Sequence, residues 1–122
     1  MRFLAVGLGG ALGAMARYGV SLAIATFWRR EFPLATLIAN ISGCFLLGFF
    51  ATLGTERIPI DPTMRLLIMT GFIGAYTTFS TFEYETQRLV EGGAWWPAVL
   101  NVTLSLAAGF VAVEIGILLA RR

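Results

Sequence analysis

Four long apolar segments, separated by short polar connections, make up nearly the whole chain. Charged residues divide the sequence into segments at residues 3–28, 33–55, 66–90 and 94–120. A helix needs roughly 20 mainly apolar residues to cross the hydrocarbon layer of a membrane, and each segment is long enough. The pattern therefore predicts an all-α membrane protein in which residues 1–122 form a single domain of four transmembrane helices.

The overall composition agrees with a membrane setting. Of the 122 residues, 57% are hydrophobic and 13% are charged, and the mean hydropathy is +0.79. These values are too apolar for a water-soluble fold of this length. Because the three connections are short, we expect the functional residues to lie within the membrane-spanning segments.

Arginine supplies all of the positive side-chain charge. Nine Arg and seven acidic residues give a net charge of +2, which argues against a nucleic-acid partner. The distribution of basic residues between the two sides sets the orientation of a membrane protein, and here the difference is only five to three. Such a small bias is compatible with insertion in both orientations and with an antiparallel homodimer. The two groups are Arg2, Arg57, Arg65, Arg121 and Arg122 on one side, and Arg29, Arg30 and Arg88 on the other.

Several classes of chemistry are excluded by the residues that the chain lacks. Cys44 is the only cysteine and there is no histidine. A disulfide within the chain, a zinc site built from Cys or His, and a Cys–His nucleophile pair are therefore excluded. With no nucleophile–base pair in view, we expect that the protein is not an enzyme.

The third apolar segment is a poor sequence for a regular helix. Two glycines, Gly71 and Gly74, are followed by four hydroxyl residues between positions 77 and 81. Glycine lowers helix stability, and Ser and Thr side chains compete for backbone hydrogen bonds. The segment predicts a helix broken near its middle, at residues 74–78, where irregular backbone must line a cavity or be buried in protein. The alternative is that the hydroxyls bond to the backbone of their own helix.

Two phenylalanines lie just after the predicted break, within the same segment. Phe79 and Phe82 are three residues apart and would share one face of a helix, which is also typical of core packing. An aromatic ring has a positive edge, so two rings beside hydroxyl groups could contact a desolvated anion weakly. Weak contacts of this kind suit conduction, which requires both binding and release.

The second and fourth segments each carry a polar stripe. Thr36 and Asn40 are one helical turn apart, and so are Asn101 and Ser105. An unpaired amide within a membrane is energetically unfavourable, so Asn40 either forms a hydrogen bond between helices or serves a transported ion.

Two features of the first segment have more than one interpretation. Gly9 and Gly13 form a small-xxx-small pattern that serves either a contact between subunits or packing within one chain. Arg17 lies deep in the segment, where an ionisable residue is by default a functional-site hypothesis. It either lines an aqueous vestibule or forms a buried ion pair with Glu83 or Glu85.

The residues resemble the Fluc, or CrcB, family of fluoride channels over essentially the whole chain. The most specific element is the run from Thr77 to Phe82, followed by an acid at Glu85. Two departures from the family pattern are Asn101, where some relatives have an aromatic residue, and Gly109, where a hydroxyl is expected. Supporting motifs are Gly9-Gly10-Ala11-Leu12-Gly13-Ala14 with Arg17-Tyr18, and Pro33-Leu34-Ala35-Thr36-Leu37 with Asn40 and Gly43.

The resemblance implies a specific assembly and a specific set of site residues. It implies an antiparallel dual-topology homodimer in the cell (inner) membrane, with two fluoride pores that use residues of both subunits. It also implies a structural Na⁺ at the dimer interface, held by the backbone carbonyls of Gly74 and Thr77. The implied pore residues are Phe79, Phe82, Asn40, Ser105, Thr36, Ser80 and Thr81, and the implied vestibule residues are Arg17 and Glu85.

The implied function is passive export of cytoplasmic fluoride down its electrochemical gradient. Its partners would be fluoride, Na⁺, a second copy of the chain and the lipid bilayer. Two alternatives remain: a small multidrug or cation exporter of the four-helix dual-topology type, and a membrane assembly subunit that transports nothing. The exporters depend on a glutamate in the first helix, whereas this chain has Arg17 and no acid there.

Overall fold

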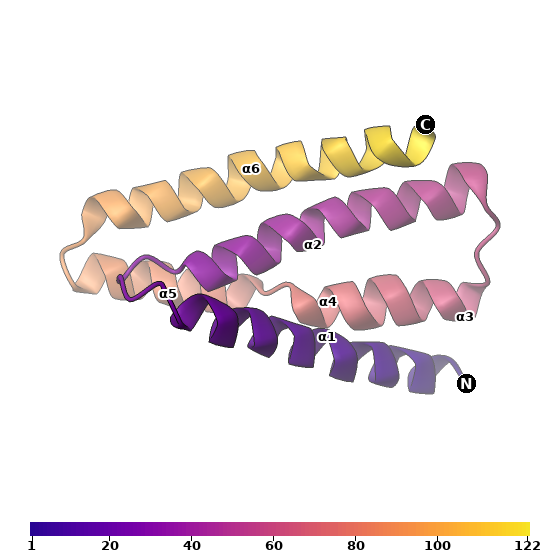
Figure 1. The fold of residues 1–122 in the computed structure, drawn as a ribbon, viewed down its shortest axis with the longest axis horizontal. Helices are drawn as coiled ribbons and strands as arrows, with labels where there is room; N and C mark the ends of the chain where they lie inside the picture. Colours follow the sequence, from indigo (N-terminus) through magenta and orange to yellow (C-terminus); the bar gives the residue numbers. More distant parts are fainter.

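The computed structural model describes all 122 residues, and every regular element in it is helical. Three long helices dominate the fold: α1 (Arg2–Ala25), α2 (Leu34–Thr52) and α6 (Trp95–Arg121). The two chain termini lie at the same end of the elongated bundle (Figure 1). Five shorter elements connect α2 to α6: η1 (Leu53–Arg57), α3 (Pro62–Arg65), η2 (Leu66–Ile73), α4 (Gly74–Tyr76) and α5 (Phe79–Glu91).

Three helical stretches are long and apolar enough to cross a membrane. They comprise residues 2–25, 34–57 and 95–121, the second being α2 continued by the π-helix η1. Their ends lie within a few residues of the first, second and fourth predicted segments. The third predicted segment, residues 66–90, is divided among the π-helix η2 and the helices α4 and α5, with Thr77 and Thr78 outside any helix.

Helices α2 and α6 pack closely because glycines lie where their backbones meet. A side chain at Gly48 would collide with the Val113 carbonyl group, and one at Gly116 would collide with the Phe45 carbonyl group. Small residues allow membrane helices to approach at this range. The α2–α6 pair forms the most extensive helix contact of the fold.

Helix α1 packs against η2 in the same way, with glycines where the two backbones meet. Gly9 meets the carbonyl oxygen of Leu67, and Gly13 meets that of Phe72. From the other side, Gly71 lies against the α1 backbone. The Gly9 and Gly13 faces are therefore used for packing within one chain, so the prediction that they join two subunits is not needed to explain them.

Exchanging Gly13 for alanine is expected to destabilise the protein by about 1–3 kcal/mol, because the added methyl group would overpack the contact with Phe72. Gly7→Ala on the same helix is the matched control, since no atom lies within 4 Å of the methyl group it would add. That control should be neutral or up to about 1 kcal/mol more stable, because alanine favours helix. Unfolding in detergent micelles measures both, and equal stability of the two variants would contradict the packing role of Gly13.

Candidate ion pathway

Two extended residues separate α4 from α5. Thr77 has φ −84° and ψ 158°, and Thr78 has φ −154° and ψ 119°. Both the amide and the hydroxyl of Thr77 donate to the carbonyl of Ile73, each at 3.0 Å. Helix α5 begins directly after Thr78, because the Thr78 hydroxyl accepts a hydrogen bond from the Thr81 amide at 3.3 Å and caps the first turn of the helix.

Asn40 of α2 forms two hydrogen bonds to the extended segment. Its Nδ2 donates to the Thr78 carbonyl at 3.0 Å, and its Oδ1 accepts from the Thr78 amide at 2.8 Å. The side-chain amide thus pairs with both backbone groups of one residue. Because an asparagine amide has two N–H donors, Asn40 retains one donor beyond this pair. Of the two roles predicted for Asn40, the structure contains the hydrogen bond between segments, and it leaves a donor for the other.

The pairing changes which backbone carbonyls are bonded. In a regular α-helix, the Thr78 amide would donate to the Gly74 carbonyl and the Thr81 amide to the Thr77 carbonyl. Here the Thr78 amide donates to Asn40, and the Thr81 amide donates to the Thr78 hydroxyl. Both carbonyls predicted to hold Na⁺ therefore lack their regular helical donor, and carbonyl oxygens are suitable ligands for an alkali cation.

The two phenylalanines lie in different surroundings. Phe79, the first residue of α5, is 74% exposed, whereas Phe82 is only 7% exposed. Their ring centroids are 5.9 Å apart, with an angle of 43° between the ring planes. Phe82 therefore belongs to the interior of the chain, while Phe79 presents its ring to whatever covers this face of the protein.

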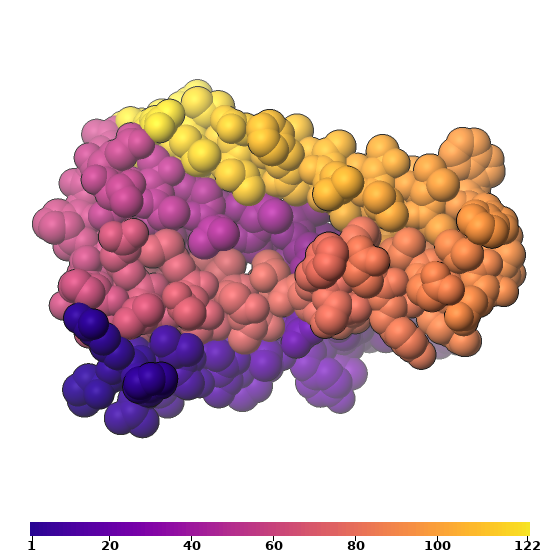
Figure 2. Space-filling model, turned by 180° about the vertical axis from the view of Figure 1, so that it is seen from behind, coloured from indigo at the N-terminus to yellow at the C-terminus, as the bar shows by residue number.

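A pocket of about 240 Å³ lies beside the exposed Phe79. Seen from behind, the segment that follows α3 lies between α1 and α6, and atoms of α2 are visible between that segment and α6 (Figure 2). Asn40 borders the pocket, so its remaining N–H is near an accessible space. The pocket is lined by Asn40, Gly43, Cys44, Leu47, Ile73, Thr77, Thr78 and Phe79.

A hydrogen-bond chain joins α6 to α5 next to Phe82. Asn101, which is 1% exposed, donates from Nδ2 to the Thr86 hydroxyl at 2.9 Å. The Thr86 hydroxyl in turn donates to the Phe82 carbonyl at 2.8 Å. Thr86 was absent from the predicted site residues, although its position one turn after Phe82 would have indicated it.

Two buried oxygens have no hydrogen-bond partner within the protein. They are Ser105 Oγ on α6 and Glu85 Oε2 on α5. Buried polar atoms are normally hydrogen-bonded, so each is a candidate contact for an ion, a ligand or water. Ser105 was predicted as a pore residue and Glu85 as a vestibule residue.

The remaining predicted pore residues are spread along the start of α2 and α5. Thr36 is buried and its hydroxyl faces the Glu85 carboxylate. The Thr81 hydroxyl accepts from the Thr78 hydroxyl at 3.0 Å, and Ser80 is exposed. Thr36 therefore lies near the vestibule residue Glu85, whereas Thr81 belongs to the cap of α5.

Arg17 does not form the buried ion pair that was offered as its alternative role. The two ion pairs of the chain join Arg88 to Glu91 and Arg121 to Glu56. The Arg17 side chain is half-buried, and its backbone carbonyl accepts from Ser21 at 3.2 Å. The ion-pair interpretation with Glu83 or Glu85 is therefore wrong within one chain.

Comparison with known proteins gives a consistent family assignment. Residues 4–117 match the family described as CrcB-like protein, Camphor Resistance (CrcB). A "Fluoride-specific ion channel FluC" of Solibacter usitatus is 45% identical over 122 residues, which is all of both chains. Proteins with the same name from Acidobacterium capsulatum and Roseiflexus sp. are 48% and 42% identical; they match 100% and 99% of this chain and 98% of their own lengths. With its long apolar helices, this chain is a multi-pass membrane protein that belongs to the CrcB-like family.

Proposed function

We propose that this protein is a fluoride-selective channel of the cell (inner) membrane that lets cytoplasmic fluoride leave passively. The relatives named as fluoride-specific ion channels, 42–48% identical over nearly the whole chain, support the choice of ion. The observation that carries the site is the pairing of Asn40 with the extended Thr78, next to Phe79. In this proposal η2, α4 and α5 form the third of four membrane crossings, interrupted at Thr77 and Thr78.

Fluoride is small and strongly hydrated, so a selective path has to replace its water with close donors. Asn40 retains one N–H donor beside the pocket, and the Ser105 hydroxyl has no partner in the protein. The positive ring edges of Phe79 and Phe82 would add weak contacts. No Lys or Arg lines the pocket beside Phe79, so an anion there would not be held by a fixed charge.

The proposed channel is an antiparallel homodimer, with each pore using residues of both copies. The exposure of Phe79 supports this arrangement, because the aromatic ring and the pocket beside it lie on an open face of one chain. A second copy on this face would enclose the polar groups of the interruption, which otherwise lie exposed at membrane depth. The weak Arg bias between the two sides agrees with insertion in both orientations.

A Na⁺ held by Gly74 and Thr77 of both copies would complete the proposed dimer. The donor set fits a hard cation, since the regular donors of both carbonyls are diverted to other acceptors. Four such carbonyls, two from each copy, would surround the ion with oxygen. This site would be structural, because the ion would join two interrupted helices rather than travel with fluoride.

Fluoride efflux from liposomes tests the proposed function. Purified protein is reconstituted into liposomes loaded with the potassium salt of fluoride or chloride. A potassium ionophore is then added to dissipate the membrane potential that would otherwise oppose anion efflux, and an anion-selective electrode follows release. We expect rapid release of fluoride and little release of chloride, which is too large for the same close contacts. Absence of fluoride release, or equal release of chloride, would overturn the proposal and favour an exporter or an assembly subunit.

Replacing Na⁺ with N-methylglucamine during purification and assay tests the cation site. We expect slower fluoride efflux and a smaller dimer fraction, because ligand removal weakens the state that binds it. Adding Na⁺ back should restore both properties, whereas the large organic cation cannot fit among carbonyls. Unchanged efflux and an unchanged dimer fraction in thoroughly Na⁺-depleted samples would refute a structural sodium site, without affecting the proposal of fluoride transport.

A further inference from the structure

Two arginines and no acidic residue line a pocket of about 450 Å³ beside the start of α1. This pocket lies at the end of the bundle that carries the N-terminus and α3 (Figure 1). It differs from the pocket at the ends of α1 and α5, which is lined by arginines and glutamates together. The lining residues of the arginine pocket, as we call it below, are Arg2, Ile60, Pro62, Arg65, Leu66, Met69 and Thr70.

Both arginines of the pocket are available to an anion. Arg2 begins α1 and Arg65 ends α3, and both side chains are exposed. The two ion pairs of the chain lie elsewhere, so no acidic side chain neutralises either arginine. Asp61, the acid closest to Arg65 in sequence, does not line the pocket, and its Oδ2 accepts from the amides of Thr63 and Met64. Each guanidinium therefore keeps its N–H donors for a ligand.

Close packing of α1 on η2 fixes the backbones of the two arginines relative to each other. Gly71 of η2 lies against the Val6 carbonyl oxygen of α1, with no room for a side chain between them. Arg2 is one helical turn before Val6, and Arg65 precedes Gly71 by six residues of continuous helix. The pair is thus positioned before a ligand arrives, which lowers the entropy cost of binding.

The pocket lining changes from charged to apolar with depth in the membrane. Arg2 and Arg65 lie at the end of the bundle, where α1 begins and α3 joins η2. Because α1 and the helical stretch at residues 34–57 both span the membrane from this end, the two arginines are at the level of the lipid headgroups. Leu66 and Met69 follow along η2 toward the middle of the bundle, and both are half-buried. A phospholipid has the same order of charged and apolar groups.

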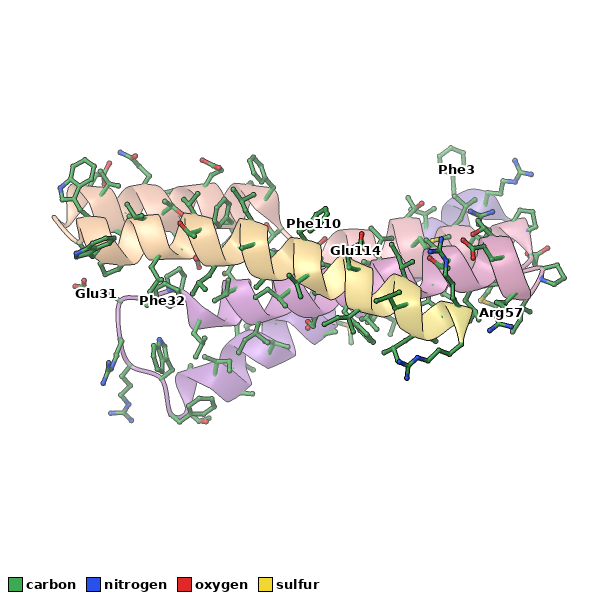
Figure 3. The ribbon with its side chains drawn as sticks, turned by 90° about the horizontal axis from the view of Figure 1, so that it is seen from above. Phe3, Glu31, Phe32, Arg57, Phe110 and Glu114 are labelled. Carbon is green, nitrogen blue, oxygen red and sulfur yellow. The ribbon has the colours of Figure 1, made fainter.

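We propose that the arginine pocket binds an anionic phospholipid such as phosphatidylglycerol. Its phosphate would lie between Arg2 and Arg65, because guanidinium groups bind phosphate oxygens by paired, charge-assisted hydrogen bonds. Its acyl chains would pass Leu66 and Met69 into the hydrocarbon layer. Phe3, the residue after Arg2, is 95% exposed and points away from the bundle (Figure 3), as expected of a side chain in contact with lipid.

The charge of the headgroup decides which phospholipids fit. Phosphatidylethanolamine and phosphatidylcholine carry the same phosphate, but their ammonium groups would lie near two guanidinium groups, with no acid in the pocket to balance the positive charge. The glycerol headgroup of phosphatidylglycerol has hydroxyl groups and no positive charge. The inference does not depend on fluoride transport, because it concerns only the contacts of one chain with lipid.

Native mass spectrometry of the full chain in detergent tests the proposal with these three phospholipids, all with the same acyl chains. We expect phosphatidylglycerol to bind at least about tenfold more tightly than the other two, and Arg2→Gln and Arg65→Gln each to weaken its binding about fivefold. Arg122→Gln is the matched control, because it removes the same charge at the same end from an exposed residue outside the pocket. Equal binding of the three lipids, or an equal loss in all three variants, would overturn the proposal.

The same spectra distinguish two other occupants of the arginine pocket. Monomer and dimer differ in mass, so a contact between two copies would appear as a lower dimer fraction in Arg2→Gln and Arg65→Gln with unchanged lipid binding. Glycerol 3-phosphate, which has a phosphate but no acyl chains, tests for a free metabolite, and we expect it to compete only weakly. A lower dimer fraction without loss of lipid, or competition as strong as that of the lipid itself, would refute a lipid site.

Discussion

Asn40→Asp is expected to reduce fluoride efflux by about a hundredfold or more while leaving the chain able to insert. The change keeps the side-chain shape but replaces the Nδ2 donor with an oxygen that faces the Thr78 carbonyl at the position of a 3.0 Å hydrogen bond. Leaving a partner group unpaired away from water costs about 1–3 kcal/mol, and two groups are affected, because the second N–H of Asn40 is also lost. Each 1.4 kcal/mol of lost stabilisation corresponds to about a tenfold fall in efflux.

The Asn40 variants separate two duties of the amide. Asn40→Ala removes both hydrogen bonds to Thr78. We therefore expect it to lower the dimer fraction that Na⁺ stabilises, as well as fluoride efflux. Thr55→Ala in η1 is the control, because the Thr55 hydroxyl bonds only to carbonyls of its own helical segment. Liposome efflux and the dimer fraction in detergent measure the two duties. Wild-type efflux from Asn40→Asp would contradict the assigned position of the amide in the ion path.

Phe82→Ile is expected to slow fluoride efflux by about tenfold to a hundredfold, equivalent to about 1.4–2.8 kcal/mol. Isoleucine fills most of the space of the buried ring but has no positive edge to offer an anion. It also removes the ring that packs 5.9 Å from Phe79. Liposome efflux measured together with the dimer fraction shows whether the pathway or the assembly has changed.

A comparison of three phenylalanines isolates the role of the ring. Phe79→Ile should slow efflux with little effect on the stability of the single chain, because Phe79 is 74% exposed there. Phe3, 95% exposed near the N-terminus and labelled in Figure 3, provides the control substitution Phe3→Ile, which should conduct normally. If Phe79→Ile and Phe82→Ile both conduct at the wild-type rate, neither ring contributes to fluoride passage.

The long helices could be predicted from sequence because hydropathy alone determines them. The ends of α1, α2 and α6 lie within a few residues of the predicted segments. The irregular backbone was predicted at residues 74–78, whereas Gly74 is helical and only Thr77 and Thr78 are extended. The difference arises because the interruption is held by Asn40, which is 38 positions away from Thr78 in sequence.

Tertiary contacts explain the predictions that failed or were missed. The proposed ion pair of Arg17 with Glu83 or Glu85 depended on the distance between side chains of two different helices. Residue spacing along one helix does not give that distance. The bond of Asn101 to Thr86 and the pocket at the ends of α1 and α5 both depend on how separate helices meet. Sequence patterns locate such residues on a helix, but they do not say which neighbour each residue faces.

The order in which the helices pair has a consequence for biosynthesis. The two most extensive contacts join α1 to η2 and α2 to α6, and in both the partners are not neighbours in sequence. While the chain is being made, the glycine surface at Gly48 has no partner until Gly116 has been synthesised, almost at the C-terminus. Most of the chain must therefore enter the bilayer before the bundle can close. Premature termination before α6 would leave an inserted fragment with an open glycine surface, a ready substrate for membrane proteases or for incorrect pairing.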